Sequence, residues 1–393
     1  MFTQEDFKRD AARGLKIIGN MNTVIHCHHY NSRLQRTLEM NTKIDGKKII
    51  KEAAAQVYFE LLTTLKNQKN STDNLELAAS LFKFLGFGIL DFSNLNEGLV
   101  ISPFSHYVEG WQCGSINTEG CVCRVTEGYI EGAVKAILGR NISATEVSCY
   151  NQIDTTSCHF KIVELVAPKY DFNITRFEQF SFSPEPKEKE VASNIDKSTI
   201  VQTIMDMPLE GNNEGLIPAF NVYLAHTPQD FYNKVCINFI KEMDRFGFVD
   251  IAKEMLVEDA ENCALNTFAG ILDSEEWDAL ISPMIKEDRD KIFGLVAVAN
   301  ALGWGRINVK EHNSIESLEL TSSNGYEAFG YIELEEYSNE PKCFMLRGIT
   351  AGLMELVYEK GELEDRVGKF NSTELTCLTQ KNNCCHFLAS YSK

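Results

Sequence analysis

Long hydrophobic runs and secretion signals are both missing from this 393-residue chain. The longest apolar stretch, near residues 293–303, is too short to span a bilayer and is interrupted by Asn300. The first residues, MFTQEDFKRDAARG, lack the apolar core and the cleavage pattern of a signal peptide. These absences predict a soluble, cytoplasmic protein without membrane insertion.

Positive charge is also scarce, with 38 Lys and Arg against 56 Asp and Glu and a net charge of -18. An acidic chain without a basic cluster argues against nucleic acid as a partner. The chain contains neither a phosphate-binding Gly-x-x-x-x-Gly-Lys-Ser/Thr motif nor a Gly-x-Gly-x-x-Gly motif after a strand, so ATP and dinucleotide chemistry have no support. A composition of 44% apolar and 24% charged residues is that of a globular protein, long enough for two or three domains.

Cysteine, in contrast, is abundant, with twelve residues. Without a secretion signal, these favour reduced thiols and metal ligands over disulfides. Cys123 precedes an amphipathic segment, Glu146 stands three residues before Cys149, and Cys158 follows a polar turn. Three thiolates and one carboxylate suit a tetrahedral zinc ion with no position open for water, so the site is predicted to be structural.

The same pattern returns near the C-terminus. The second quartet consists of Cys343, Glu374, Cys377 and Cys385. In both copies, two glycines follow the first cysteine at the same offsets, where we expect the helix to lie close against a sheet. The tetrapeptides LGFG (85–88) and LGWG (302–305) end an apolar helix in each half. Since chance alignment of so many positions is remote, the chain is interpreted as a duplication with two zinc ions.

Two ligand positions have neighbouring alternatives. Cys121 competes with Cys123, and the glycine offsets favour Cys123. Cys384 competes with Cys385, and the Cys-x-Phe register favours Cys385. The alternative to metal ligation is that these cysteines are buried as small hydrophobic residues.

Helical and strand periodicities predict an α+β fold in which each repeat is an antiparallel sheet packed by helices. Expected helices are 1–20, one starting at Arg33, 47–65, 75–85, 125–138, 198–207, 229–246, 277–284 and 291–302. Expected strands are 88–92, 98–102, 107–112, 142–147, 218–225 and one beginning at Cys158. The predicted division is a first lobe at 1–166, a linker with a bridging helix at 167–216, and a second lobe at 217–393. The linker includes Pro184-Glu185-Pro186 and the charged run 187–190.

The cluster His26-Cys27-His28-His29-Tyr30 is the candidate for catalysis. On an extended strand, His26, His28 and Tyr30 share one face and can orient a polar group, bind an additional transition metal or transfer protons. Cys27 beside the histidines is a possible nucleophile. The alternative is a hydrogen-bonded strand end without activity. The second half does not preserve this cluster, and around residues 221–230 only one histidine, His226, remains.

These motifs together resemble the 4-vinyl reductase domain family in two tandem copies, over residues 75–160 and 290–388. The resemblance implies a fold similar to subunits of the TRAPP transport particle and a homodimer. In the sensor heads of phenol- and xylene-responsive activators, a matching Cys-Glu-Cys-Cys quartet binds structural zinc beside an apolar pocket. Relatives in tetrapyrrole biosynthesis belong to the same family.

The resemblance therefore implies a zinc protein that binds a small, largely apolar molecule, aromatic or tetrapyrrole-like. Candidate ligand-binding residues are His29, Phe104, Tyr107 and Trp111. Because the second half lacks the full histidine cluster, the working pocket is expected in the first lobe. The alternatives are a metal-dependent biosynthetic or catabolic enzyme that uses His26, His28 and His29, and a scaffold or assembly subunit.

Overall fold

The computed structural model describes residues 1–69, 74–113, 120–174 and 190–392. The helices are α1 (His28–Met40), α2 (Gly46–Lys69), α3 (Glu76–Phe84), α4 (His106–Gln112), α5 (Arg124–Leu138), α6 (Lys197–Asp206), α7 (Gln229–Asp244), α8 (Val249–Leu272), α9 (Glu275–Leu280), α10 (Asp288–Ala301), α11 (Tyr326–Glu335), α12 (Phe344–Tyr358) and α13 (Leu363–Arg366). The strands are β1 (Phe7–Asp10), β2 (Leu15–Ile18), β3 (Met21–Cys27), β4 (Leu99–Ser102), β5 (Ile142–Ser148), β6 (Cys158–Glu164), β7 (Ile217–Ala219), β8 (Val222–Pro228), β9 (Ile307–Asn313), β10 (Ser317–Ser322), β11 (Phe370–Thr376) and β12 (Cys385–Tyr391). Short 3-10 helices lie at Gln4–Asp6, Leu95–Glu97, Ser282–Met284 and Leu378–Gln380.

A central sheet joins the two halves of the chain. Its strand order is β1-β2-β3-β8-β7, and β3 pairs antiparallel with β8, with Thr23 opposite Pro228 and Cys27 opposite Leu224. Every residue of β3 is buried, as expected for a strand covered on both faces. The two halves therefore share one sheet, which the local sequence of neither half reveals.

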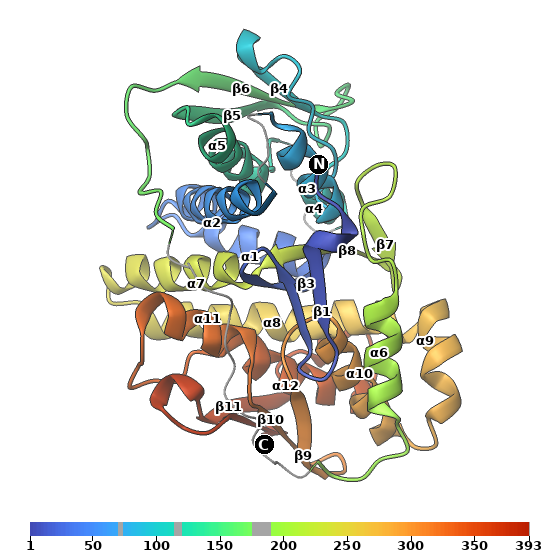
Figure 1. Ribbon diagram of the computed structural model, residues 1–393. Helices are drawn as coiled ribbons and strands as arrows, with labels where there is room; N and C mark the ends of the chain where they lie inside the picture. Colours follow the sequence, from blue (N-terminus) through green and yellow to red (C-terminus); the bar gives the residue numbers. More distant parts are fainter. Residues whose placement is uncertain (70–73, 114–119, 175–189, 393) are drawn as a thin grey trace.

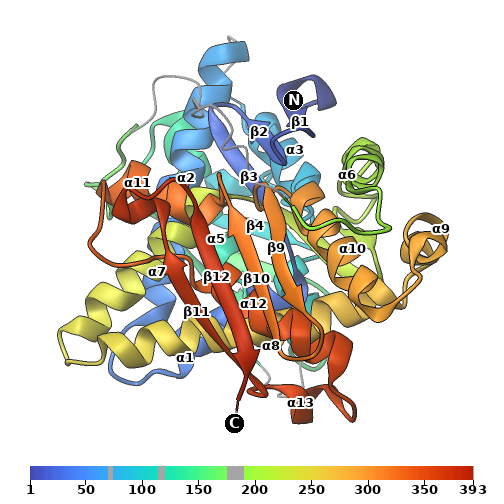
Figure 2. The ribbon, with the colours of Figure 1, turned by 90° about the horizontal axis from the view of Figure 1, so that it is seen from below.

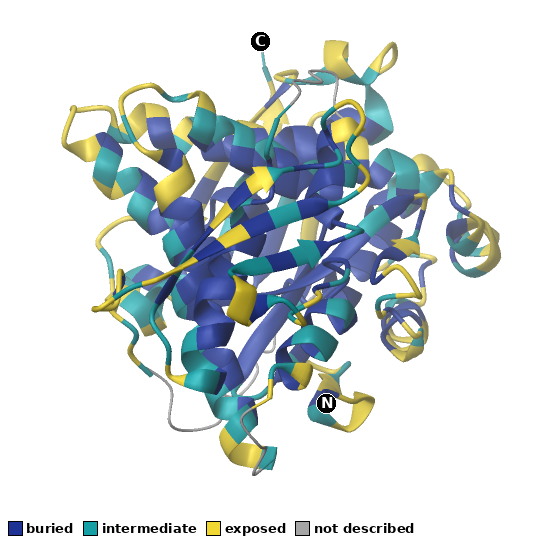
Figure 3. Ribbon diagram, turned by 90° about the horizontal axis from the view of Figure 1, so that it is seen from above, coloured by how far each residue is buried: buried dark blue, intermediate teal, exposed yellow. Residues whose placement is uncertain are grey.

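Two outer sheets enclose the helices, as Figure 1 shows. The first half supplies the order β4-β6-β5 and the second half the order β11-β12-β10-β9. Helices α5, α2, α7, α8 and α12 lie between these sheets, and Figure 2 shows the outer face of the four-stranded sheet without a covering helix. Buried residues gather at the centre, as Figure 3 shows. The predicted α+β fold, with antiparallel sheets packed by helices, is confirmed.

The repeated glycines bring two helices together in each half. A Cβ atom on Gly128 of α5 would overlap the carbonyl oxygen of Lys51 in α2, and one on Gly348 of α12 would overlap that of Val257 in α8. The prediction that these glycines lie against a sheet is therefore wrong. They lie against a helix, because only a residue without a side chain lets two helix backbones approach this closely.

The LGFG and LGWG tetrapeptides connect each half to the other. The amide of Ile25 in β3 donates to the carbonyl oxygen of Leu302 at 2.8 Å, and the amide of His226 in β8 donates to that of Leu85, also at 2.8 Å. Trp304 strengthens the first contact, because its Nε1 donates to the oxygen of Ile25 at 2.8 Å. The duplicated motif thus anchors the strand of the opposite half.

Several local predictions differ from the structure. Residues 7–10 and 15–18 are strands and not a helical lead-in, and residues 107–112 lie in α4 and not in a strand. The predicted helices at 47–65, 75–85, 125–138, 198–207, 229–246 and 291–302 are present within a few residues of their expected bounds. Residues 175–189 of the predicted linker, 167–216, lie outside the described residues. Within the described part of the chain, no helix combines the length and apolarity that crossing a bilayer requires.

Candidate functional site

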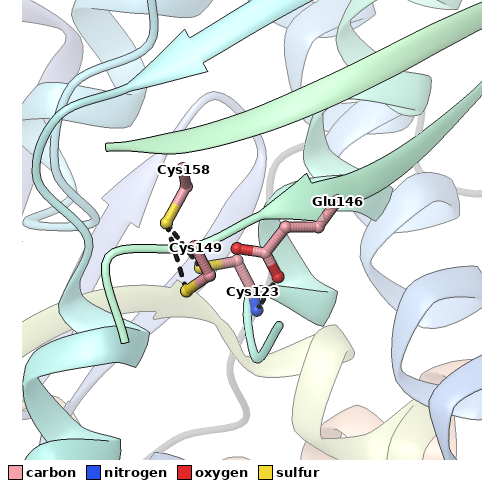
Figure 4. Close-up of side chains that lie close together, drawn as sticks. All are labelled: Cys123, Glu146, Cys149 and Cys158. Atoms are coloured by element: carbon pink, nitrogen blue, oxygen red, sulfur yellow. Dashed lines mark hydrogen bonds between the residues drawn. The ribbon is translucent and has the colours of Figure 1, made fainter. Parts of the chain in front are cut away.

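The first quartet gathers around the N-terminus of α5, as Figure 4 shows. Cys123 is the residue that precedes α5, Glu146 lies in β5, and Cys158 begins β6. The register between β5 and β6 shifts between Glu146 and Ser148. A bulge of this kind redirects the chain at a strand end, and Cys149 follows it directly.

The three sulfur atoms of this quartet are separated by distances that fit a shared metal ion. The Sγ atoms of Cys123 and Cys158 are 3.7 Å apart, and those of Cys158 and Cys149 are 3.4 Å apart. A disulfide requires about 2.0 Å, whereas two thiolates on a tetrahedral zinc ion with Zn–S bonds of about 2.3 Å lie roughly 3.8 Å apart. The separations therefore match metal ligation.

Glu146 places an unpaired carboxylate oxygen atom close to these three sulfur atoms. Its Oε2 accepts a hydrogen bond from the amide of Cys123 at 2.8 Å, while its buried Oε1 has no partner among the described residues. An unpaired buried carboxylate oxygen is costly, and a metal ion beside the thiols would satisfy it. Burial raises the pKa of the Glu146 carboxyl to about 8.

The second quartet repeats this geometry. The Sγ atom of Cys343 lies 3.8 Å from that of Cys377 and 3.5 Å from that of Cys385, and the last two are 3.6 Å apart. Oε2 of Glu374 accepts from the amide of Cys343 at 2.9 Å, and its Oε1 has no partner among the described residues. The residues present thus fit a metal ion in both halves.

One thiol in each quartet is poised to ionise. The Cys123 and Cys158 side chains hydrogen-bond to Cys149 and hold the pKa of its thiol at about 3, well below the usual range. In the second copy, Cys343 and Cys385 act on Cys377 in the same way and lower the pKa of its thiol to about 2. A thiolate is the form that binds metals.

The structure brings together the eight residues that the sequence indicates. The ligand atoms of Cys123, Glu146, Cys149 and Cys158, and likewise those of Cys343, Glu374, Cys377 and Cys385, all lie within 4.8 Å of one another. Cys121 and Cys384 are half-buried and lie outside both groups. These are the only groups of this kind among the described residues, and the histidine cluster is not one of them.

The residues of the histidine cluster belong to two different elements, because β3 ends at Cys27 and α1 begins at His28. The prediction of one extended strand through Tyr30 is therefore wrong. His26 is fully buried, with its Nε2 3.2 Å from the hydroxyl of Tyr326 and its ring stacked on Trp304 at 4.9 Å. The ring of Tyr30 lies 4.6 Å from that of His26.

His28 and His29 lie in the first turn of α1, away from His26. His28 Nδ1 accepts from the amide of Tyr223 at 3.1 Å, and the ring of His29 lies 4.0 Å from that of His28. Burial lowers the pKa of His26 and of His28 to about 3. Both imidazoles are therefore neutral near pH 7.

The aromatic residues expected to bind a ligand are packed against other side chains. Tyr107 lies 5.7 Å from the ring of Phe87, and Trp111 lies under the guanidinium of Arg36 at 4.4 Å. Phe104 is half-buried in the turn between β4 and α4, where its carbonyl oxygen accepts from Ser102. Their function in ligand binding stays a prediction.

An apolar cavity of about 140 Å³, which the sequence does not indicate, lies between α7 and α11 in the second half. Its lining comprises Tyr30, Tyr232, Asn233, Cys236, Ile237, Ile240, Lys241, Tyr326, Glu327, Tyr331, Lys342 and Phe344. The sequence analysis places the working pocket in the first lobe, whereas this cavity belongs to the second half and receives only Tyr30 from the first.

At the corresponding place in the first half, the described residues make polar contacts. Gln35 of α1 donates through Nε2 to the carbonyl oxygen of Val122 at 2.7 Å, and Arg124 lies 3.4 Å from Glu39. The Tyr-Asn pair and the first cysteine of each half align the two copies. On that alignment, Gln35, Glu39 and Arg124 are replaced in the second half by Ile237, Lys241 and Phe344. The two halves have therefore diverged at this cavity.

Comparisons with known proteins found one weak structural similarity and no family. No protein-family model matches the chain, and no curated protein matches it. Among solved structures, the chain is similar to the phenol-responsive sensory domain of the transcription activator PoxR, which was determined with phenol. The identity is 14%, the match covers 40% of this chain and 73% of the other, and the TM-score is 0.32. This similarity is too weak to assign a family.

Proposed function

We propose that the protein holds one zinc ion in each half and binds a small, largely apolar molecule in the cavity beside the second quartet. The observation that carries the proposal is the position of this cavity, because two of its lining residues, Lys342 and Phe344, flank Cys343. A third, Glu327, accepts from the amides of Met345 and Leu346 at 2.8 and 3.0 Å.

The zinc ions would be structural. Cys343 stands at the N-terminus of α12, Glu374 lies in β11, and Cys385 begins β12. An ion bound by all four side chains would hold this helix end to the sheet, and metal binding of this kind contributes directly to folding free energy. In the second half, the same helix end forms one wall of the cavity.

The volume of the cavity favours a ligand with one aromatic ring. A buried apolar cavity of about 150 Å³ accommodates benzene, close to the 140 Å³ found between α7 and α11. A tetrapyrrole is far larger, so the cavity supports the aromatic alternative. Tyr30 is one of the residues that line the cavity, and its hydroxyl can form a hydrogen bond with one polar atom of the ligand.

Metal analysis of the purified protein tests the first part of the proposal. We expect about two zinc ions per chain, one after Cys149→Ser and one after Cys377→Ser, with two retained in the control variants Cys121→Ser and Cys384→Ser. Protein without metal, or loss of zinc from the control variants, would contradict the assignment of the quartets.

Calorimetric titration with single-ring aromatic compounds tests the second part. Ile237→Gln introduces the residue that the first half carries and should weaken binding at least tenfold, because a buried amide without a partner is costly. Ile251→Gln on the exposed side of α8 is the control and should leave binding unchanged. Equal affinity in both variants would exclude this cavity as the site.

Homodimerisation, the enzyme that uses the histidine cluster and the scaffold function stay predictions. No specific contact of the described residues favours any of them.

A further inference from the structure

A groove of about 650 Å³ with many polar lining residues runs along the contact between α1 and α8, and it shares no lining residue with the apolar cavity. Residues at helical spacing line both walls, including Arg33, Arg36 and Thr37 from α1 and Asp259, Asn262 and Asn266 from α8. Two helices that face each other normally bury apolar residues between them. A polar lining at this position therefore requires an explanation.

The duplication provides an internal reference for this groove. The Tyr30-Asn31 pair of α1 matches Tyr232-Asn233 of α7. Helix α2 matches α8, because Gly128 lies against the carbonyl oxygen of Lys51 as Gly348 lies against that of Val257. The pairing of α7 with α2 is thus the counterpart of the pairing of α1 with α8.

Three of the six polar residues named above are matched by buried apolar residues in the counterpart interface, whereas Arg36, Asn262 and Asn266 are matched by the polar residues Asn238, Gln56 and Glu60. Arg33 and Thr37 of α1 are matched by Val235 and Phe239 of α7, which are both fully buried. Asp259 of α8 is matched by Ala53 of α2, which is also fully buried. The positions of Arg33, Thr37 and Asp259 are therefore polar in one of the two equivalent helix interfaces and apolar in the other.

Asp259 is the most unusual residue of the groove, because it is only 4% exposed. Its Oδ1 accepts from the hydroxyl of Thr37 at 2.9 Å and lies 3.2 Å from Nε of Arg33. Its Oδ2 is buried and has no hydrogen-bond partner among the described residues. A carboxylate oxygen in this state is destabilising unless a donor from outside the chain reaches it.

The asparagines extend the row of acceptors along α8. The side-chain amide of Asn262 donates to the carbonyl oxygen of Glu258 at 2.9 Å, and that of Asn266 donates to that of Asn262 at 2.8 Å. One N–H of each side-chain amide is engaged within the helix, and the side-chain oxygen atoms can accept from a ligand. On the opposite wall, Arg36 is held over Trp111, and its Nε has no hydrogen-bond partner among the described residues.

We propose that this groove binds an amino-acid-like zwitterion, a free amino acid or a dipeptide, with its ammonium group on Asp259 and its carboxylate on Arg33 and Arg36. A guanidinium recognises a carboxylate through paired donors, and an ammonium group supplies the donor that Oδ2 of Asp259 lacks. The asparagine oxygens then accept from the N–H groups of a second residue. The proposal does not depend on the zinc ions or on the aromatic cavity.

Thermal-shift and calorimetric titrations of the full-length protein with the twenty amino acids and a set of dipeptides test the proposal. We expect at least one of these compounds to bind. Asp259→Ala should weaken its binding at least tenfold. Arg33→Gln should weaken binding of the zwitterion but not binding of the corresponding amino-acid amide, which lacks the carboxylate. Asp250→Asn, at the 97% exposed side chain near the start of α8, is the control and should bind normally.

The stability of the variants distinguishes a ligand site from a structural ion pair. Asp259→Ala restores the residue of the counterpart interface, so its melting temperature without ligand should equal or exceed that of the unchanged protein, and the isosteric Asp259→Asn should behave similarly. A lower melting temperature for both variants, no binding of any tested amino acid or dipeptide, or normal binding by Asp259→Ala would each overturn the proposal.

Discussion

Asp259 also predicts a pH dependence of stability. Burial raises the pKa of its carboxyl from 3.8 to about 6, against the opposing effects of Thr37 and Arg33. Since the native state binds this proton more tightly than the unfolded state, the group destabilises the protein as the pH rises from about 4 to about 6. A shift of about two pKa units corresponds to on the order of 3 kcal/mol.

Asp259→Asn removes this titration. The free energy of unfolding of both proteins should be measured in urea at a series of pH values. Relative to the unchanged protein, the variant should become more stable as the pH rises from about 4 to about 6, and the difference in free energy should stay constant above pH 6. Because both proteins have the same cysteine quartets, loss of metal in acid cancels in the comparison. A difference independent of pH would show that Asp259 ionises normally in the folded protein.

The metal ligands could be predicted from the sequence because their spacing recurs. The Glu-x-x-Cys step crosses a strand bulge in each copy, and the helix begins directly after Cys123 and Cys343. The histidines could not be placed in the same way. Their alternation was interpreted as a strand, whereas Cys27, whose Sγ accepts from the amide of Tyr30 at 3.5 Å, starts a helix. Cysteine is not among the preferred residues at that position.

At the level of helices and strands, the glycine contacts predict a specific sensitivity. Gly128→Ala and Gly348→Ala would each force two helices apart, and overpacking of this kind costs about 1–3 kcal/mol. Gly270 in α8 is the matched control, since the nearest atoms to a Cβ there would be a side-chain atom of Val222, at 3.3 Å, and the carbonyl oxygens of Phe220 and Asn221, at 3.4 and 3.8 Å. Chemical denaturation should show destabilised Gly128 and Gly348 variants and an unaffected or slightly stabilised Gly270→Ala.

Long amphipathic helices such as α2 and α7 could be predicted from their own periodicity. The N-terminal strands could not, because the partner of β3 is β8, about 200 residues later in the chain, and a local pattern contains no information about that pairing. Helix α4 was missed for a similar reason. Tyr107 and Trp111 look like strand residues by type, but their packing against Phe87 and Arg36 decides their conformation.

At the scale of the whole molecule, the shared sheet predicts that the two halves do not fold alone. Residues 1–166 expressed separately would leave β3 without β8, and the carbonyl oxygen of Leu85 without its donor, His226. Residues 217–393 expressed separately would leave β8 without β3, and the carbonyl oxygen of Leu302 without its donor, the amide of Ile25. We expect each half to lack a cooperative thermal transition and the two to regain one when they are coexpressed.

Scanning calorimetry and circular dichroism of the separate and combined halves provide the measurement. The full chain should unfold in a single transition, because the pairing of β3 with β8 joins the two halves in one central sheet. A separate half that melts cooperatively with its own zinc ion would instead show that the predicted boundaries define independent domains.

The pairing of β3 with β8 also has a consequence for biosynthesis. A ribosome adds roughly 5–20 residues per second, so the strand at Met21–Cys27 is synthesised about 10–40 s before its partner at Val222–Pro228. Throughout that interval the nascent chain presents an apolar strand with an open edge, the kind of surface that recruits other chains. Because β3 waits for β8, we expect chaperones to contact the nascent chain during translation. We also expect the yield of folded protein to depend on the speed of elongation.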